Sequence, residues 1–493
     1  MGNYITFPEL LIWIPFIGGL VTFFIKAERP ARWVSLLFAL STLGVSIATL
    51  FFKGSEHQSW NTVNYFWLKY IGNSFYLGID PVSRVLILLT ALCMPLIILM
   101  AGQNNYKQSR YFYGLLLLSQ AGIIGVFCAL DALLFYFFWE LALIPAYFLS
   151  SIWGGPRRIP ATFKFFVYTF LGSLLMLAGI LYVYMHSPGR MFEDGTTAQH
   201  SFALKSFLIT SLSAGEQIWL YLLFFFAFAI KMPIFPFHTW QPEAYDQSPS
   251  PVTMLLSAVM VKMGLFGLVR WLLPLFPLAA TVMEQWVIIF SVIGIIYASC
   301  IAIVQDNVKY MAAYSSIAHI GLMAAAIFTG NLMATEGAMM QLFNHGINIL
   351  GVWVVLDIIE RKTGAKNISA ISGLAVKAPV LSIFALLIAF ANIALPLTNA
   401  FAGEFLMFAG IYQFNPWLAA VAGISVILAA IYMLNMLRRV FFGEPGDAVL
   451  SVSDIKGTDL LVLAVIAVII LVTGFYPEAL LGLAREAAAT VIR

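Results

Sequence analysis

The chain has 493 residues, of which 61% are hydrophobic and only 10% are charged, and its formal net charge is +3. A soluble domain carries about 25% charged residues and has no means of hiding this much apolar surface, so a soluble enzyme is excluded. The high hydrophobicity excludes intrinsic disorder, and the weak, dispersed positive charge excludes a nucleic-acid-binding surface.

Long apolar runs predict an all-α polytopic membrane protein. The runs are continuous, whereas the strands of a membrane β-barrel would alternate apolar and polar residues. At about 20 apolar residues per span, we predict about 14 transmembrane helices in one integral membrane domain, residues 1–493. The predicted spans run at roughly 4–24, 32–52, 84–102, 112–130, 132–151, 163–185, 216–238, 252–273, 284–304, 308–329, 337–359, 380–411, 416–437 and 459–479.

Two polar stretches interrupt the spans. Residues 53–83 predict a short hairpin outside the membrane, and residues 186–214 contain a Gly195-Thr196-Thr197 turn. Of the 26 basic residues, sixteen lie in one set of loops and flanks, and eight lie in the opposite set together with both termini. The positive-inside rule therefore predicts that the first set faces the cytoplasm and that both termini lie outside.

Six ionisable side chains fall inside the predicted spans, where a charge costs about 2.5–3.5 kcal/mol on insertion scales. They are Glu140, Lys231, Lys262, His319, His345 and Glu404. One buried histidine alone is most often a hydrogen-bonded core residue. Six such groups on six spans favour a hydrated proton or ion path, and we call them the ionisable belt.

Two of the predicted spans contain helix-breaking residues. Pro233 and Pro236 interrupt the seventh span directly after Lys231, which predicts free carbonyls at Ala229 and Met232. The twelfth span becomes polar between residues 392 and 399. Discontinuous helices in matching places of two halves are typical of transporters built from inverted repeats.

The spacing of the ionisable belt also indicates a repeat. Glu140 and Lys231 are 91 residues apart, and His319 and Glu404 are 85 residues apart. Each pair joins the second and fourth spans of a predicted five-span unit, at about 112–273 for the first unit and about 284–437 for the second. An odd number of spans gives consecutive units opposite orientations, as an inverted repeat requires.

Short motifs surround the ionisable residues. They are Phe138-Trp139-Glu140-Leu141 with Pro145, Lys231-Met232-Pro233, the run from Pro236 to Ala244, Lys262-Met263-Gly264 with Gly267 and Arg270, Tyr314 to His319 with Gly321, Asn344-His345-Gly346, and Phe401 to Phe405. As a set, these motifs resemble the antiporter-like membrane subunits of respiratory complex I, most closely subunit 4, which is chain M in bacteria. The resemblance runs from about the third to the thirteenth span.

The resemblance implies proton-transfer roles for the belt. Glu140 would pair with Lys231, Lys262 and the two histidines would relay protons toward the centre, and Glu404 would be the carrier on the exit side. Many relatives have Lys at the last position, so a Glu favours subunit 4. Three positions depart from the family pattern: Gln241 replaces Leu, Tyr245 replaces His, and Leu397 replaces the Gly that follows the proline of the broken helix.

The resemblance also implies partners, location and reaction. We expect a subunit of a proton-translocating NADH:quinone oxidoreductase in the bacterial cytoplasmic membrane, next to other membrane-arm subunits that include homologous antiporter-like chains. Flavin, iron–sulfur clusters and quinone are expected in partner subunits, with no cofactor, metal or redox chemistry in this chain. The three cysteines, Cys93, Cys128 and Cys300, lie in apolar runs without ligand spacing.

A switch between two pairing states supplies a physical mechanism. A Glu140–Lys231 pair at about 5 Å is worth about 3 kcal/mol at an effective dielectric constant of about 20. Breaking the pair leaves the cost of burying the Lys231 charge unopposed, which drives its proton toward Lys262 or His319. Three other functions stay open: a subunit of a multi-chain cation/proton antiporter, a membrane-arm subunit that does not pump, and a stand-alone solute transporter.

Overall fold

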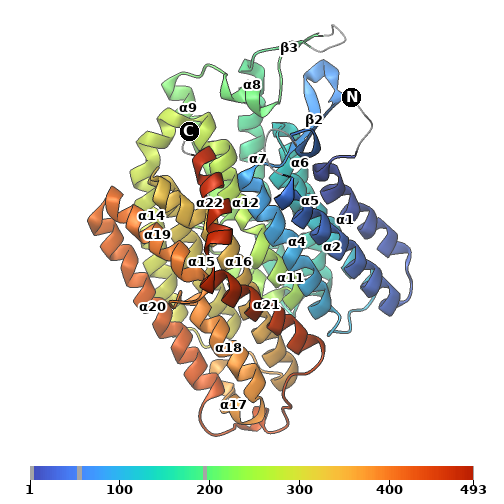
Figure 1. The fold of residues 1–493 in the computed structure, drawn as a ribbon, viewed down its shortest axis with the longest axis vertical. Helices are drawn as coiled ribbons and strands as arrows, with labels where there is room; N and C mark the ends of the chain where they lie inside the picture. Colours follow the sequence, from blue (N-terminus) through green and yellow to red (C-terminus); the bar gives the residue numbers. More distant parts are fainter. Residues whose placement is uncertain (1–4, 53–57, 192–196, 492–493) are drawn as a thin grey trace.

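Helices make up most of the fold (Figure 1). The structure is a computed structural model that describes residues 5–52, 58–191 and 197–491, except for the side chains of residues 58, 59, 190 and 191. Gly195 and Thr196 of the predicted turn lie outside the described residues. The fold class predicted from the apolar runs, an all-α polytopic membrane protein, is confirmed.

Thirteen helical segments among the described residues are long and apolar enough to cross a bilayer. They are α1 (Phe7–Phe24), α2 (Glu28–Phe51), α4 (Pro81–Ala101), α5 (Ser109–Cys128), α6 (Ala132–Trp153), α7 (Arg158–His186), α9 (Ala214–Lys231), the segment Ser250–Leu275, α14 (Pro277–Val304), α15 (Val308–Phe328), α16 (Leu332–Thr363), α20 (Pro416–Phe441) and α21 (Thr458–Phe475).

The predicted twelfth span is two shorter helices, α18 (Pro379–Asn392) and α19 (Asn399–Phe414). The seventh span is also broken, because α9 ends at Lys231 and the chain re-forms a helix only at α10 (Gln241–Gln247). The sequence therefore predicted both breaks at the right places. The fourth span of each predicted five-span unit is interrupted, whereas the boundaries of the units stay a prediction.

The segment Ser250–Leu275 alternates between α and π turns. It consists of α11 (Ser250–Leu255), the π turn η3 (Leu256–Met260), α12 (Lys262–Gly267), the π turn η4 (Leu268–Leu272) and α13 (Leu273–Leu275). This segment and α16 are the two spans whose apolar windows are wholly buried. A helix that is apolar on all sides belongs in the core, and these two carry Lys262 and His345.

The remaining elements are short and connect the spans. They are α3 (Gln58–Asn61), β1 (Thr62–Leu68), η2 (Lys69–Ile71), β2 (Asn73–Gly78), β3 (Arg190–Met191), β4 (Thr197–Ala198), α8 (Leu204–Leu208), η5 (Ile368–Ala370), α17 (Leu374–Lys377) and η6 (Asp447–Val449). Strands β1 and β2 pair antiparallel with Thr62 opposite Gly78, which confirms the hairpin predicted within 53–83. A last helix, α22 (Glu478–Val491), lies against α4 and α16.

The hairpins and the two chain termini lie at the same end of the molecule, opposite α17 (Figure 1). This arrangement agrees with an even number of spans and with both termini on one side of the membrane. The side that faces the cytoplasm stays a prediction from the basic loops.

A buried carboxylate fixes the β1–β2 hairpin to the bundle. Asp131 accepts hydrogen bonds from Nδ2 of Asn73 (2.8 Å) and from the backbone N–H of Ser74 (3.1 Å). It also caps α6 by accepting from the N–H groups of Leu133 and Leu134. Burial raises the pKa of Asp131 to about 6, because its cost outweighs the four hydrogen bonds that act in the opposite direction.

Candidate functional site

Lys262 and His345 meet at the centre of the bundle. The Lys262 ammonium donates to the carbonyl oxygen of Ser257 at 2.7 Å and lies 3.0 Å from Nδ1 of His345. A charged ammonium only donates, so Nδ1 accepts and the ring proton of a neutral imidazole is on Nε2. That Nε2 atom is buried and has no hydrogen-bond partner among the described residues. Water is the partner that a buried N–H of this kind requires.

The π turns on both sides of α12 change the hydrogen-bond ladder around Lys262. The N–H of Val261 bonds to the carbonyl of Leu256, five residues back, instead of to that of Ser257. The Ser257 carbonyl instead accepts from the Lys262 ammonium. Single π turns inside α-helices are frequent at functional sites, and the sequence pattern did not predict these two.

His319 is held between two backbone carbonyls. Its Nδ1 lies 2.8 Å from the carbonyl oxygen of Ser315, and its Nε2 lies 3.1 Å from that of Asn392. A carbonyl oxygen only accepts, so both contacts are hydrogen bonds only when both ring nitrogens carry a proton. The Asn392 carbonyl is at the end of α18, where the helix break leaves it without its usual helical donor. The break therefore supplies an acceptor for the imidazolium form of His319.

Glu404 is the acidic partner of His319. Nε2 of His319 lies 3.5 Å from Oε1 of Glu404, and both side chains are almost fully buried. Gln341 donates from Nε2 to the same Oε1 at 3.2 Å. A cavity of about 10 Å³ adjoins both residues and is also lined by Ser299 and Tyr432. This volume has room for about one water molecule.

A stripe of amide side chains on α16 faces the broken span. Gln341, Asn344 and Asn348 occupy positions i, i+3 and i+7, which lie on one face of a helix. Asn344 donates to the carbonyl of Asn399 (2.7 Å), and Asn348 donates to that of Ala391 (3.0 Å). These residues were not among the predicted site residues. The signal that reveals them is a helically spaced polar stripe in an otherwise apolar span.

The break between α18 and α19 contains a strained residue. Leu397, which replaces the usual glycine, has φ = +72°, in the left-handed region that disfavours side chains. Its carbonyl approaches Gly474 of α21 so closely that a Cβ atom at position 474 would collide with it. Helix α21 thus holds the break from outside, and the departure from the family pattern at Leu397 leaves the break in place.

Lys231 is buried on aromatic rings. It is the last residue of α9, where the helix dipole favours a positive charge. Its ammonium lies 5.5 Å from the ring centre of Trp139 and 6.0 Å from that of Phe165, within the range of cation–π attraction. The Nζ atom has no hydrogen-bond partner among the described residues.

The break that follows Lys231 is partly satisfied by nearby donors. The carbonyl of Ala229, which the sequence predicted to be free, accepts from the N–H of Ile234 at 3.2 Å. The carbonyl of Ile230 accepts from the indole N–H of Trp240 at 2.9 Å. The broken segment is therefore a defined turn rather than an open helix end.

Glu140 lies near Lys231 but is not in direct contact with it. It is half-buried on α6, and the charges of the two residues interact. Among the described residues, no ion pair within 4.0 Å joins them, and Oε1 of Glu140 has no hydrogen-bond partner. In this arrangement the two side chains are apart, and the Lys231 ammonium lies on its aromatic neighbours.

The structure thus places the belt in three groups: Glu140 with Lys231, Lys262 with His345, and His319 with Glu404. The rings of His345 and His319 have centres 5.3 Å apart at 38°, which links the last two groups. No direct contact among the described side chains joins Lys231 to Lys262. Their helices touch, however, because a Cβ atom at Gly264 would lie 2.8 Å from the backbone nitrogen of Met232.

Comparisons with known proteins identify the family of the chain. The family model described as "NADH:quinone oxidoreductase/Mrp antiporter, TM" matches residues 129–431. The chain is 36% identical to NADH-quinone oxidoreductase subunit M of Rhodobacter capsulatus over 470 residues, which covers 95% of this chain and 91% of the relative.

Two solved structures have the same fold. A chain of respiratory complex I from Thermus thermophilus superposes with a TM-score of 0.87 at 29% identity, over 98% of this chain and 99% of the other. A chain of the Mrp complex from Dietzia superposes with a TM-score of 0.87 at 18% identity, over 99% of this chain and 97% of the other. At this low identity, the second match concerns the fold alone.

Proposed function

Since the chain belongs to the NADH:quinone oxidoreductase/Mrp antiporter membrane family, we propose that it is a proton-translocating subunit in the membrane arm of a NADH:quinone oxidoreductase. The relative from Rhodobacter capsulatus, which is matched over nearly its whole length, supports the assignment to this complex. Electron transfer takes place in partner subunits, and this chain moves protons in response. Its basic loops face the cytoplasm and both termini face the periplasm.

One observation carries the proposal: Lys262, His345, His319 and Glu404 follow one another through the buried centre, with contacts of 3.0 Å at one end and 3.5 Å at the other. Each group gains and loses a proton without leaving its place. Only the gap between the two imidazole rings needs a bridging water molecule. The cost of removing ionisable groups from water can exceed the attraction that they gain from a partner, so four of them in the core are difficult to explain in a purely structural subunit.

Glu140 and Lys231 act as the switch. In the separated state, the Lys231 ammonium keeps only cation–π contacts, so it releases its proton more readily than it does beside a carboxylate. Closing the pair restores the charge on Lys231. A conformational signal from the redox subunits that alternates the two states loads and discharges the relay.

The switch is tested with Glu140→Gln and Lys231→Ala in the assembled complex. Electron transfer from NADH to quinone and proton uptake into membrane vesicles are measured together, and assembly is checked by co-purification. We expect fewer protons per electron in both variants. Unchanged pumping per electron in an assembled complex would show that this chain only supports the membrane arm.

A further inference from the structure

We propose that Asp246, Lys366 and Glu360 are positioning residues: their ion pairs hold α10 against the second unit and thereby set how water from the cytoplasmic end reaches the buried side chains of α10. The inference rests on the proposed function, because it concerns how protons reach the relay. It adds a role for charged residues that lie outside the ionisable belt.

Helix α10 has an unusual position in the chain. It starts ten residues after Lys231, on the far side of the break, and its last residues lead directly into the segment that carries Lys262. Two of its side chains, Gln241 and Tyr245, are buried, and their polar atoms have no hydrogen-bond partners among the described residues. Both positions depart from the family pattern, since Gln241 replaces an apolar Leu and Tyr245 replaces another polar residue, His. Gln241 and Tyr245 lie close enough to interact with each other, and water is the usual further partner of buried polar atoms of this kind.

Tyr245 lies at the contact between the two units. Its ring packs edge-on against Trp353 of α16, with ring centres 5.7 Å apart, and also against Trp240 at 6.4 Å. A small movement of α10 relative to α16 therefore changes the space around the Tyr245 hydroxyl. The first turn of α10 is tied to α7 by the Lys164–Glu243 ion pair (3.2 Å), and its C-terminal end has contacts on two sides.

On one side, neutral hydrogen bonds tie this end to the first unit. The N–H of Gly155 donates to the carbonyl of Gln247 (2.7 Å), and the N–H of Arg157 donates to Oε1 of Gln247 (2.9 Å). The hydroxyl of Ser248 bonds to that of Ser150 (2.9 Å). These contacts involve loop backbone and uncharged side chains, so they do not depend on charge.

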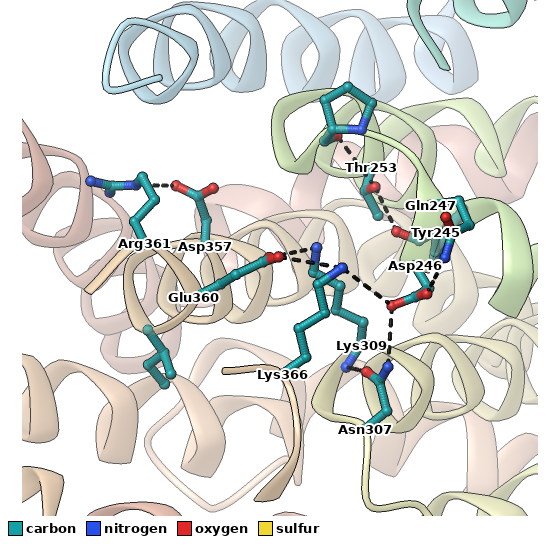
Figure 2. Close-up of polar contacts among 12 residues, drawn as sticks. Tyr245, Asp246, Gln247, Thr253, Asn307, Lys309, Asp357, Glu360, Arg361 and Lys366 are labelled. Atoms are coloured by element: carbon teal, nitrogen blue, oxygen red, sulfur yellow. Dashed lines mark hydrogen bonds and ion pairs between the residues drawn. The ribbon is translucent and has the colours of Figure 1, made fainter. Parts of the chain in front are cut away.

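On the other side, charged contacts tie the same end to the second unit (Figure 2). Asp246 accepts a hydrogen bond from Asn307 at 3.1 Å and lies 3.8 Å from the Lys366 ammonium. Lys366 also lies 3.3 Å from Glu360 at the end of α16, and Glu360 pairs with Lys309 of α15 at 2.6 Å. The ion pairs thus form one connected network from α10 to α15 and α16.

A pocket of about 280 Å³ opens where the network lies. Its lining includes Asp246, Lys366, Glu360 and Lys309 together with Ser250, the first residue of α11. The pocket has room for several water molecules, and its charged walls are polar enough to hold them. It lies at the end of the bundle where α16 finishes and α11 begins, which the basic loops place at the cytoplasmic surface.

The network is well suited to a positioning role. Asp246 is almost fully buried and receives both a charged and a neutral contact from the second unit, so loss of its charge weakens the hold without removing the hydrogen bond. An ion pair of which one partner is buried is weak evidence for net stability and can instead fix how two elements sit against each other. Mutations in contact networks change the coupling between sites by about 0.5–2 kcal/mol.

The test compares isosteric variants in the assembled complex. Asp246→Asn keeps an acceptor for Asn307 and removes the charge, and Lys366→Met removes the partner charge. In each variant, the part of the proton uptake per electron that passes through this chain is expected to fall about two- to thirtyfold. Electron transfer is expected to be retained. Asp246→Glu, which keeps the negative charge beside Lys366, is expected to pump more like the wild type than Asp246→Asn does.

The control is Arg439→Gln, which removes an exposed ion pair between α20 and Asp306 that does not include α10. This variant is expected to pump as the wild type does. Normal proton uptake in Asp246→Asn, or an Asp246→Glu variant no better than Asp246→Asn, would overturn the inference. A parallel Lys262→Met variant distinguishes failure of this inference from failure of the proposed function. If this variant also pumps normally, the proposed function itself fails.

Discussion

The Lys262 ammonium lies 3.0 Å from Nδ1 of His345, although 83 residues separate them in the chain. The contact joins the segment Ser250–Leu275 to α16, and these are the two spans whose apolar windows are wholly buried. It therefore connects the first predicted unit to the second at the centre of the bundle. His345 is the titratable group that the Lys262 ammonium contacts directly.

Replacement of His345 by glutamine distinguishes its hydrogen bond with Lys262 from its proposed role in proton transfer. The glutamine carbonyl can still accept from Lys262, but the side chain does not take up a proton at neutral pH. We expect proton transfer through this chain to slow roughly 10²-fold, the low end of what a positioned acid–base group contributes, with assembly retained. The measurement is proton uptake per electron in vesicles. His186→Gln, an exposed histidine at the end of α7, is the control, and equal uptake in both variants would contradict the relay.

Leu397→Gly tests the strain at the second break. A left-handed backbone conformation costs a residue with a side chain about 1–2 kcal/mol. Glycine removes this strain, but the greater entropy of its unfolded chain cancels part of the gain in stability. Because the Leu397 side chain is mostly exposed, we expect the thermal transition to rise slightly, by the equivalent of about 0.5–1 kcal/mol. Leu395→Gly, two residues away and without positive φ, is expected to lower it. A lower transition in Leu397→Gly would show that the side chain contributes packing that outweighs the strain.

Asp131 gives a pH dependence whose sign follows from its environment. Its pKa is about 6 in the folded chain, above the ordinary 3.8. Between these values the folded state keeps a proton that the unfolded chain has lost, so stability falls as pH rises through this window. The difference corresponds to about 3 kcal/mol for this one group.

The comparison variant is Asp131→Asn, which does not titrate. We expect the thermal transition of the wild type, measured relative to this variant, to fall as the pH rises from about 4 to about 6. The variant also leaves the N–H of Ser74 without its acceptor, which lowers its stability by a similar amount at every pH. A wild-type advantage that stays constant across the window would contradict the assigned environment of Asp131.

The spans were predictable because their apolar runs are long enough to cross a bilayer. The belt residues were predictable because ionisable side chains are rare in such runs. The breaks were predictable because proline cannot continue a helix. The partners inside the belt were not predictable, since the Lys262–His345 contact depends on how distant helices pack. The sequence placed Glu140 with Lys231; in the structure their charges interact without an ion pair, and the Lys231 ammonium lies over the ring of Trp139.

The π turns, helix α22 and the amide stripe of α16 are not revealed by long apolar runs or by charged residues within them. The π turns around Lys262 arise from packing and leave no fixed pattern of residue types. Helix α22 was not predicted because Arg485 and Glu486 interrupt its apolar residues and because the stretch is too short to span a bilayer. The amide stripe of α16 had a signal, its helical spacing, but amides stand out less than charges in an apolar run.

The most direct test of the central claim replaces Lys262 with methionine, which has a similar length and no charge, in the assembled complex. Proton uptake into vesicles is measured per electron transferred to quinone. If the buried series from Lys262 to Glu404 conducts protons, the ratio falls below that of the wild type while the complex stays assembled. A ratio equal to that of the wild type, with Lys262→Met fully incorporated, would contradict the account.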